Sequence, residues 1–182
     1  DYMNNFKLSF VQGRLSKKIG TNFQHFPINN WQDEFTIAKR IKIKNIEWII
    51  SDLSNPIFNP YSILEIDKLL KKNQLKISSI SLDLIMKNPF HQWSLKDIDW
   101  LTENLNIALK KFKIKRLNLP CEETSRFFNN KDFLLFKKNS KRLIKKINKD
   151  TLVSLESDFS PKNLKNLIKK INSNKVGINL DI

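Results

Sequence analysis

The sequence has 182 residues, of which 40% are hydrophobic and 28% are charged, a balance that excludes an intrinsically disordered chain and allows one domain with a buried core. Its 33 Lys and Arg residues outnumber its 18 Asp and Glu residues, and the resulting net charge of +15 would suit a nucleic-acid binder. However, the lysines lie mostly on the polar faces of predicted helices without interleaved aromatic residues, so we favour a solvated outer surface over a nucleic-acid partner.

Six runs of alternating or β-branched apolar residues predict strands along the chain. These runs lie at residues 6–11, 45–50, 75–83, 114–120, 151–158 and 175–181. Between them, apolar residues spaced by three or four positions predict five helices with one apolar stripe each, at residues 31–41, 60–70, 94–112, 133–147 and 161–171. Polar residues that favour N-caps stand where four of these helices begin: Asn30, Asn59, Ser94 and Ser160.

The regular alternation of strands and helices predicts an α/β protein with a parallel sheet and helices on its outer face. A closed barrel of this class needs eight strands and usually about 250 residues. Six strands and five helices therefore predict a partial (β/α)8 TIM barrel, truncated after strand six. We expect a single domain over residues 1–182 that is incomplete at its C-terminus.

Carboxylates stand at the ends of the last two predicted strands. Glu156 lies near the end of the strand at 151–158, and Asp181 ends the strand at 175–181. Because one helix separates these strands, both side chains are expected at the same end of neighbouring parallel strands, where α/β folds bind ligands and metals. They are either a functional pair or ordinary solvated loop carboxylates and helix caps.

The single cysteine, Cys121, excludes an intrachain disulfide and favours a reducing compartment, so we expect a cytoplasmic protein. No apolar stretch approaches the roughly 18 residues that a membrane span needs, and we expect no membrane partner. The two histidines, His25 and His91, fall in loops away from strand ends, and we expect neither to bind a metal.

A fairly specific group of segments lies between Gln12 and Trp48: Gln-Gly-Arg-Leu-Ser at 12–16, Phe-Pro at 26–27, Trp31, Glu-Phe at 34–35 and Ile-Glu-Trp-Ile at 46–49. This group resembles the xylose isomerase-like TIM barrel superfamily, and more closely its sugar phosphate isomerases/epimerases. Shorter similar segments follow at 82–86, 88–89, 119–120, 155–158 and 177–181, so the resemblance covers essentially the whole chain.

The resemblance implies a divalent metal (Mn, Mg, Co or Zn) at the C-terminal mouth of the barrel. The usual ligands in the superfamily are a Glu ending strand five, an Asp ending strand six, a His from strand seven and a Glu from strand eight. Glu156 and Asp181 match the first two, and Glu156 is also the expected catalytic residue. The other two ligands would lie beyond Ile182, so the resemblance leaves open whether residues 1–182 alone are active.

The same resemblance implies a carbohydrate-metabolism enzyme that moves a proton beside the carbonyl of a sugar or sugar phosphate through an enediolate. Glu47, Asp83, Arg14 and Trp48 are the expected substrate-binding residues. For the three charged residues, ordinary surface ion pairs are an open alternative, and for Trp48 a place in the core is another. An assembly of identical copies is also left open.

Two other functions compete with the isomerase hypothesis. The superfamily includes abasic-site endonucleases, whose DNA binding would suit the net charge of +15. Those enzymes need several histidines at strand ends, whereas the third and fourth predicted strands end in Asp83 and Pro120, which argues against this hypothesis. A barrel without catalytic activity that acts as a binding module is the second alternative.

Overall fold

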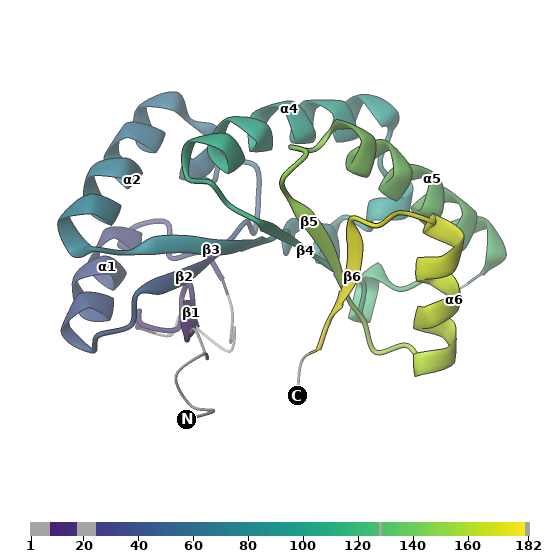
Figure 1. The fold of residues 1–182 in the computed structure, drawn as a ribbon, viewed down its shortest axis with the longest axis horizontal. Helices are drawn as coiled ribbons and strands as arrows, with labels where there is room; N and C mark the ends of the chain where they lie inside the picture. Colours follow the sequence, from purple (N-terminus) through teal and green to yellow (C-terminus); the bar gives the residue numbers. More distant parts are fainter. Residues whose placement is uncertain (1–7, 18–24, 128, 181–182) are drawn as a thin grey trace. The chain divides into compact units, whose positions relative to one another are not determined.

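The computed structural model describes residues 8–17, 25–127 and 129–180, and within them strands alternate with helices (Figure 1). The strands are β1 Ser9–Val11, β2 Asn45–Ile49, β3 Lys76–Ser81, β4 Arg116–Pro120, β5 Leu152–Glu156 and β6 Val176–Asn179. The helices are α1 Trp31–Arg40, α2 Pro60–Asn73, α3 Leu84–Lys87, α4 Leu95–Lys111, α5 Asn130–Lys146 and α6 Pro161–Ile171. Short 3-10 helices lie at Pro56–Phe58, Phe90–Gln92 and Glu123–Ser125.

The strand order follows the chain order, β1-β2-β3-β4-β5-β6, and β1–β2, β4–β5 and β5–β6 pair in parallel. The prediction of an α/β protein with parallel strands is therefore confirmed. All six predicted strands and all five predicted helices are present, with strands shorter than predicted; part of the predicted strand at 6–11 lies outside the described residues. Helix α3, a single turn after β3, is an additional element that the spacing of apolar residues did not predict.

Three of the four predicted helix caps are confirmed. The Asn59 side chain accepts hydrogen bonds from two amides in the first turn of α2, and the Ser160 hydroxyl accepts one from an amide of α6. Ser94 and Asp97 form a capping box at α4, in which each side chain bonds the backbone amide of the other. Asn30 precedes α1 but makes no capping bond through its side chain, so that prediction was wrong.

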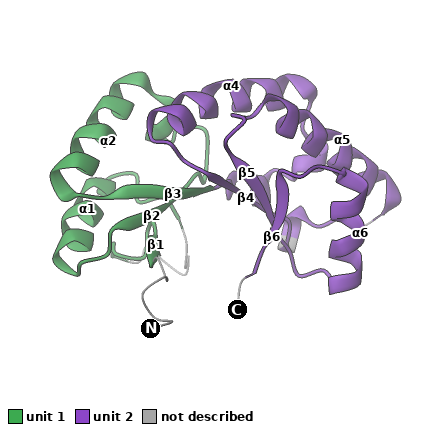
Figure 2. Ribbon diagram, in the orientation of Figure 1, with its two compact units in different colours: residues 1–80 green, residues 81–182 purple. Residues whose placement is uncertain are grey.

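The chain divides into two compact units, residues 1–80 and 81–182 (Figure 2). The first unit holds β1, β2 and most of β3 with α1 and α2, and the second holds β4, β5 and β6 with α3 to α6. The single domain expected over residues 1–182 stays a prediction. Along the part of the chain that the structure describes, no helix has both the length and the apolar character that a bilayer crossing requires.

An aromatic cluster forms much of the core of the first unit. The Trp48 side chain on β2 is fully buried, and its ring lies 5.4 Å from that of Phe26 and 5.7 Å from that of Trp31 on α1, measured between ring centroids. Phe35, one turn further along α1, is also fully buried and lies 5.7 Å from Trp31. The Trp48 indole N–H donates to the side-chain oxygen of Asn55 at 2.9 Å, so its one polar atom is satisfied.

In the second unit, the apolar stripe of α4 is buried as predicted, at Ile98, Leu101, Leu105 and Ala108. An ion cluster joins α4 to α5: both carboxylate oxygens of Asp99 accept hydrogen bonds from the Arg142 guanidinium, at 2.7 and 2.6 Å. Lys146 adds a second cation at 2.7 Å from the same carboxylate. These positive partners hold the pKa of Asp99 well below its usual range.

Candidate functional site

The register of β4, β5 and β6 gathers polar side chains on one face of these strands. Side chains alternate between the two faces of a strand, and on β5 Val153 and Leu155 are buried whereas Ser154 and Glu156 are half-buried. Asn118 of β4 lies opposite Ser154, and Asn179 of β6 lies opposite Glu156. We call Asn118, Ser154, Glu156 and Asn179 the polar cluster.

The Glu156 carboxylate is held by two neutral amide groups. Its Oε2 atom accepts a hydrogen bond from the Asn118 side-chain nitrogen and another, of 2.7 Å, from that of Asn179. The side-chain oxygen of Asn118 in turn accepts a hydrogen bond from the Ser154 hydroxyl at 3.1 Å. Hydrogen bonds therefore run from Ser154 through Asn118 to Glu156, and a second donor reaches the same carboxylate oxygen from β6.

Within the described residues, no Lys or Arg side chain forms a salt bridge with Glu156, although the chain carries a net charge of +15. Amide donors stabilise a carboxylate without neutralising its charge. A groove of about 350 Å³ lies along the same strands, and its lining includes Ser154 and Asn179 together with Arg116 and Lys175, but not Glu156. A carboxylate bonded only by amide groups is of the kind that can bind a cation.

The Cys121 thiol lies directly after β4 and is buried, with its sulfur 3.4 Å from the Leu119 carbonyl oxygen. Burial raises the pKa of this thiol, and the negative charges of Glu122 and Glu156 raise it further. Cys121 therefore stays protonated at neutral pH and is a poor nucleophile.

We expect the native protein to react with the thiol reagent DTNB at pH 8 at least about 100-fold more slowly than the same protein in denaturant. The physical reason is that both access to the sulfur and the thiolate fraction are low in the folded state. Absorbance at the wavelength of the released thiolate measures both rates. Rapid, stoichiometric labelling of the folded protein would contradict the buried, protonated thiol.

The other predicted site residues lie in different surroundings. Asp181 lies outside the described residues. Asp83 precedes α3 and accepts a hydrogen bond from the Ser81 hydroxyl at 2.7 Å. Glu47 is half-buried on β2, and its carbonyl oxygen accepts the Gln12 amide at 3.1 Å, while Arg14 is exposed in the loop after β1. Whether these residues contact a substrate stays a prediction.

Trp48 contributes to the core of the first unit. With an exposed fraction of 0%, it leaves no surface for a substrate in the described structure, and the core interpretation accounts for its position. The physical reason is strand alternation: Glu47 and Trp48 are neighbours on β2, so their side chains point to opposite faces. Because Trp48 packs against α1, it faces away from the side on which Glu47 lies.

The loop Gln12–Ser16, one of the segments on which the resemblance rests, is held in place by Glu34 of α1. The Glu34 carboxylate has an exposed fraction of 0% and accepts hydrogen bonds from the amides of Gly13, at 2.9 and 3.1 Å, and Leu15, at 3.0 Å. Burial raises the pKa of Glu34, and these amides partly oppose the shift. Gly13 has φ +90°, and a Cβ there would lie 2.3 Å from the His25 carbonyl oxygen, so only glycine fits.

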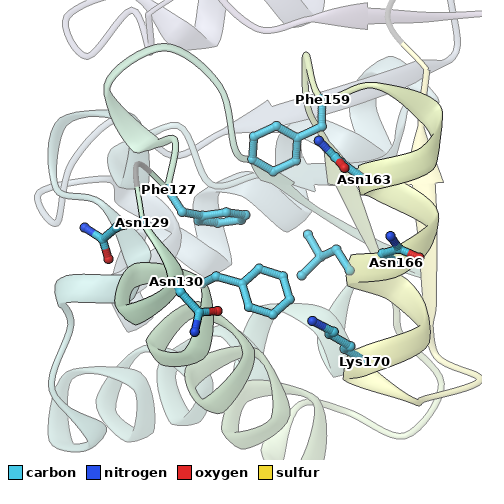
Figure 3. Close-up of a pocket in the computed structure, with 9 residues that line it drawn as sticks. Phe127, Asn129, Asn130, Phe159, Asn163, Asn166 and Lys170 are labelled. Atoms are coloured by element: carbon cyan, nitrogen blue, oxygen red, sulfur yellow. The ribbon is translucent and has the colours of Figure 1, made fainter.

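A separate pocket of about 370 Å³ opens between α5 and α6 (Figure 3). The Phe127 and Phe159 rings lie 5.0 Å apart at one side of it, and the Lys170 ammonium stands 4.7 Å from the centre of the Phe133 ring. Its rim carries the side-chain amides of Asn129, Asn130, Asn163 and Asn166. None of the predicted site residues lines this pocket, and its lining holds no carboxylate, so it does not coincide with the polar cluster.

The described residues contain no group of three or more His, Cys, Asp or Glu side chains that could hold a metal ion. The donors of the polar cluster nevertheless fit a hard divalent ion in kind, because carboxylate and amide oxygens are the ligands that such ions prefer. In the polar cluster, Glu156 is the one carboxylate that could bind such an ion.

Sequence reasoning missed Asn118, Ser154 and Asn179. A signal for them was present, since each is a polar residue inside a strand whose neighbours are largely apolar. A polar side chain in such a position needs a partner, and the parallel register supplies one. What the sequence could not supply was the register itself, which decides that these residues meet Glu156.

Neither a known protein-family model nor a curated protein matches the chain. Solved structures do match. A xylose isomerase-like TIM barrel protein from Mycobacterium smegmatis, in complex with magnesium, has a TM-score of 0.64 and 17% identity over 85% of this chain and 57% of that chain. D-psicose 3-epimerase from Clostridium cellulolyticum H10, with D-tagatose, has a TM-score of 0.63 and 12% identity over 82% and 57%.

An AP endonuclease, family 2, from Brucella melitensis has a TM-score of 0.61 and 14% identity over 97% of this chain and 69% of that chain. The chain spans less than two thirds of the length of the first two proteins. At these identities the similarity establishes the fold. The chain therefore has the α/β fold of a partial (β/α)8 TIM barrel, similar to that of these solved structures.

Proposed function

We propose that the chain is part of a metal-dependent isomerase or epimerase that acts on a sugar or a sugar phosphate. The observation that carries this proposal is the set of contacts that Glu156 makes at the end of β5: its carboxylate accepts hydrogen bonds from two neutral amide groups and forms no salt bridge with a described Lys or Arg. The C-terminal ends of parallel strands are where barrels of this class bind their ligands. The fold shared with an epimerase and with a magnesium-bound barrel protein supports the same class.

Glu156 and Asp181 are the residues of this chain that would hold the metal ion, which would be Mn, Mg, Co or Zn. When bound, such an ion polarises the oxygens of a sugar and favours loss of the proton beside the carbonyl. The chain's own contribution is to present the Glu156 carboxylate in one orientation, because amides from β4 and β6 both bond its Oε2 atom. Productive sites need such placement to within about 0.5 Å.

Glu156 is also the group proposed to move the proton. A carboxylate within hydrogen-bond reach of the carbon beside a carbonyl can accept its proton and return it to a neighbouring carbon or oxygen. The two amide donors both bond the Oε2 atom of Glu156, which leaves its other carboxylate oxygen for that proton. Isomerisation returns the proton to another atom, and epimerisation requires return on the opposite face by a second acid.

The proposal is tested by solvent exchange. The full-length protein is incubated with Mn²⁺, Co²⁺ or Mg²⁺ and a panel of ketoses and ketose phosphates in deuterated water, and deuterium at the carbon beside the carbonyl is measured by NMR. We expect exchange in the wild type and its loss in Glu156→Gln, which keeps the size of the side chain but removes its basicity. Glu103→Gln is the matched control, because Glu103 is a mostly exposed carboxylate on α4.

Retention of exchange in Glu156→Gln would contradict the assigned role, and absence of exchange in the wild type on every sugar would favour a binding module without catalytic activity. We expect residues 1–182 alone not to exchange, since two carboxylates hold an ion weakly. The abasic-site endonuclease alternative is favoured by the net charge of +15 and by the fold shared with the Brucella melitensis protein. Cleavage of a duplex with one abasic site would support that alternative instead.

A further inference from the structure

In the polar cluster, the Asn118 side chain is hydrogen-bonded at both ends of its amide group. The two ends of an Asn amide differ chemically, one donating and the other accepting hydrogen bonds. At Asn118 the oxygen faces the Ser154 hydroxyl and the nitrogen faces the Glu156 carboxylate. Turning the amide over would place its oxygen against the Glu156 carboxylate, so Glu156 selects the observed orientation, whereas the Ser154 hydroxyl can donate or accept and fits either orientation.

This arrangement constrains Glu156 through one of its two oxygens. Asn118 and Asn179 approach from the strands on either side of β5, and both donate to Oε2. Among the described residues, no hydrogen-bond donor is assigned to Oε1. The carboxylate is thus held against rotation while one oxygen is left for a further partner.

We propose that Asn118 is a positioning residue, which turns the Glu156 carboxylate so that Oε1 faces the metal and the substrate, and that the Ser154 hydroxyl supports Asn118 by bonding its side-chain oxygen. This inference rests on the proposed function of Glu156. Asn118 is only 4% exposed, so its amide has little contact with solvent and must find its hydrogen-bond partners within the protein. If Asn118 served only to join β4 and β5, a neutral side chain at position 156 could accept its hydrogen bond equally well.

The first test needs neither metal nor substrate. In a ¹⁵N–¹H NMR spectrum, the side-chain NH₂ signals of Asn118 and Asn179 are assigned and followed in wild type and in Glu156→Gln. We expect both signals to shift, because a carboxylate acceptor is replaced by a neutral amide, whereas the NH₂ signal of Asn104 on α4, which donates to the Trp100 carbonyl, should not move. Unchanged Asn118 and Asn179 signals would overturn the inference.

The second test separates positioning from folding. In the full-length protein, Asn118→Ala is expected to weaken Mn²⁺ binding, measured by electron paramagnetic resonance of the free ion, and to lower kcat for exchange, each by about 10- to 100-fold. The KM for the sugar should change little, since Asn118 does not touch the substrate. Ser154→Ala should give a smaller loss, and Ser154→Thr, which restores the hydroxyl, should recover it.

Asn104→Ala is the matched control, as it removes an exposed amide from the same unit. Equal Mn²⁺ affinity in Asn118→Ala, Asn104→Ala and wild type would overturn the inference, as would parallel losses of affinity and thermal stability. If the NMR shifts and the loss of Mn²⁺ affinity are found but the wild type exchanges no sugar, the positioning role stands and the isomerase proposal fails. A wild type that binds no Mn²⁺ would overturn both.

Discussion

Replacing Glu34 with alanine is expected to lower the free energy of unfolding by about 3 kcal/mol, since a buried amide that loses its acceptor costs about 1 to 3 kcal/mol. The Glu34 carboxylate accepts bonds from the Gly13 and Leu15 amides, and alanine would leave both donors without this acceptor. Gly13 cannot move elsewhere easily, because its backbone already lies close to the His25 carbonyl. Urea denaturation followed by circular dichroism measures the change.

Glu65→Ala is the matched control, because Glu65 is a carboxylate of the same unit whose hydrogen bond to Gln32 is exposed. We expect that change to stay within about 0.5 kcal/mol of wild type. A similarly small effect of Glu34→Ala would contradict the role assigned to Glu34, because the loop Gln12–Ser16 would then keep its conformation without the carboxylate.

The raised pKa of Glu34 adds a pH dependence with a definite sign. A carboxyl group whose pKa is higher in the folded state binds its proton more tightly there, so it stabilises the fold below its unfolded pKa. That contribution is lost as the pH rises through the folded pKa. In Glu34→Gln the side chain at position 34 does not titrate. The difference in the free energy of unfolding between wild type and this variant should therefore shrink as the pH rises from 4 to 7. A constant difference would contradict the raised pKa of Glu34.

Local rules predicted the elements of this chain well, because each depends on nearby residues. The stripe of α4 and the capping box of Ser94 and Asp97 follow from spacing alone. Asn30 shows the limit of such rules: it stands in the cap position, yet its side chain makes no capping bond. Helix α3 was not predicted, because a single turn is too short to show the helical spacing of apolar residues.

The candidate site was predicted only in part, since it depends on register and on side-chain direction. Glu156 could be singled out because it ends a strand, but its partner across the β5–β6 pair is Asn179, which no spacing rule indicates. Glu34 looked like part of a helix pattern, and its bonds to the loop after β1 arise from residues about 20 positions away. Long-range pairing of this kind has no local signature in one sequence.

Strand alternation could have decided the place of Trp48 earlier. Two adjacent residues of a strand face opposite sides, and in this structure Glu47 is half-buried on one side of β2 while Trp48 is buried on the other. The aromatic residues Trp31 and Phe35 on the preceding helix, α1, indicate which side Trp48 takes, since a large ring is best buried against other rings. The first unit therefore depends on Trp48 for its core.

Replacing Trp48 with alanine is expected to lower the free energy of unfolding by about 4 kcal/mol, the usual cost of removing a large buried aromatic ring. The side chain is fully buried, and its loss would leave a cavity between β2 and α1. Trp100 on α4 is the matched control, since it is 43% exposed, and its replacement by alanine should cost no more than about 1 kcal/mol. Denaturant titration followed by far-ultraviolet circular dichroism compares the two.

Trp48→Phe separates a core role from a substrate role. Phenylalanine keeps a ring in the cluster but loses the indole N–H that donates to Asn55, whose side-chain oxygen still accepts from the Ile57 amide, so we expect a cost of about 1 kcal/mol for the lost hydrogen bond. If Trp48 has only a core role, as its burial indicates, the KM for any sugar that the full-length protein exchanges should stay unchanged. A raised KM with unchanged stability would instead indicate that Trp48 contacts the substrate. Its buried position in this structure would then differ from its position in the substrate-bound protein.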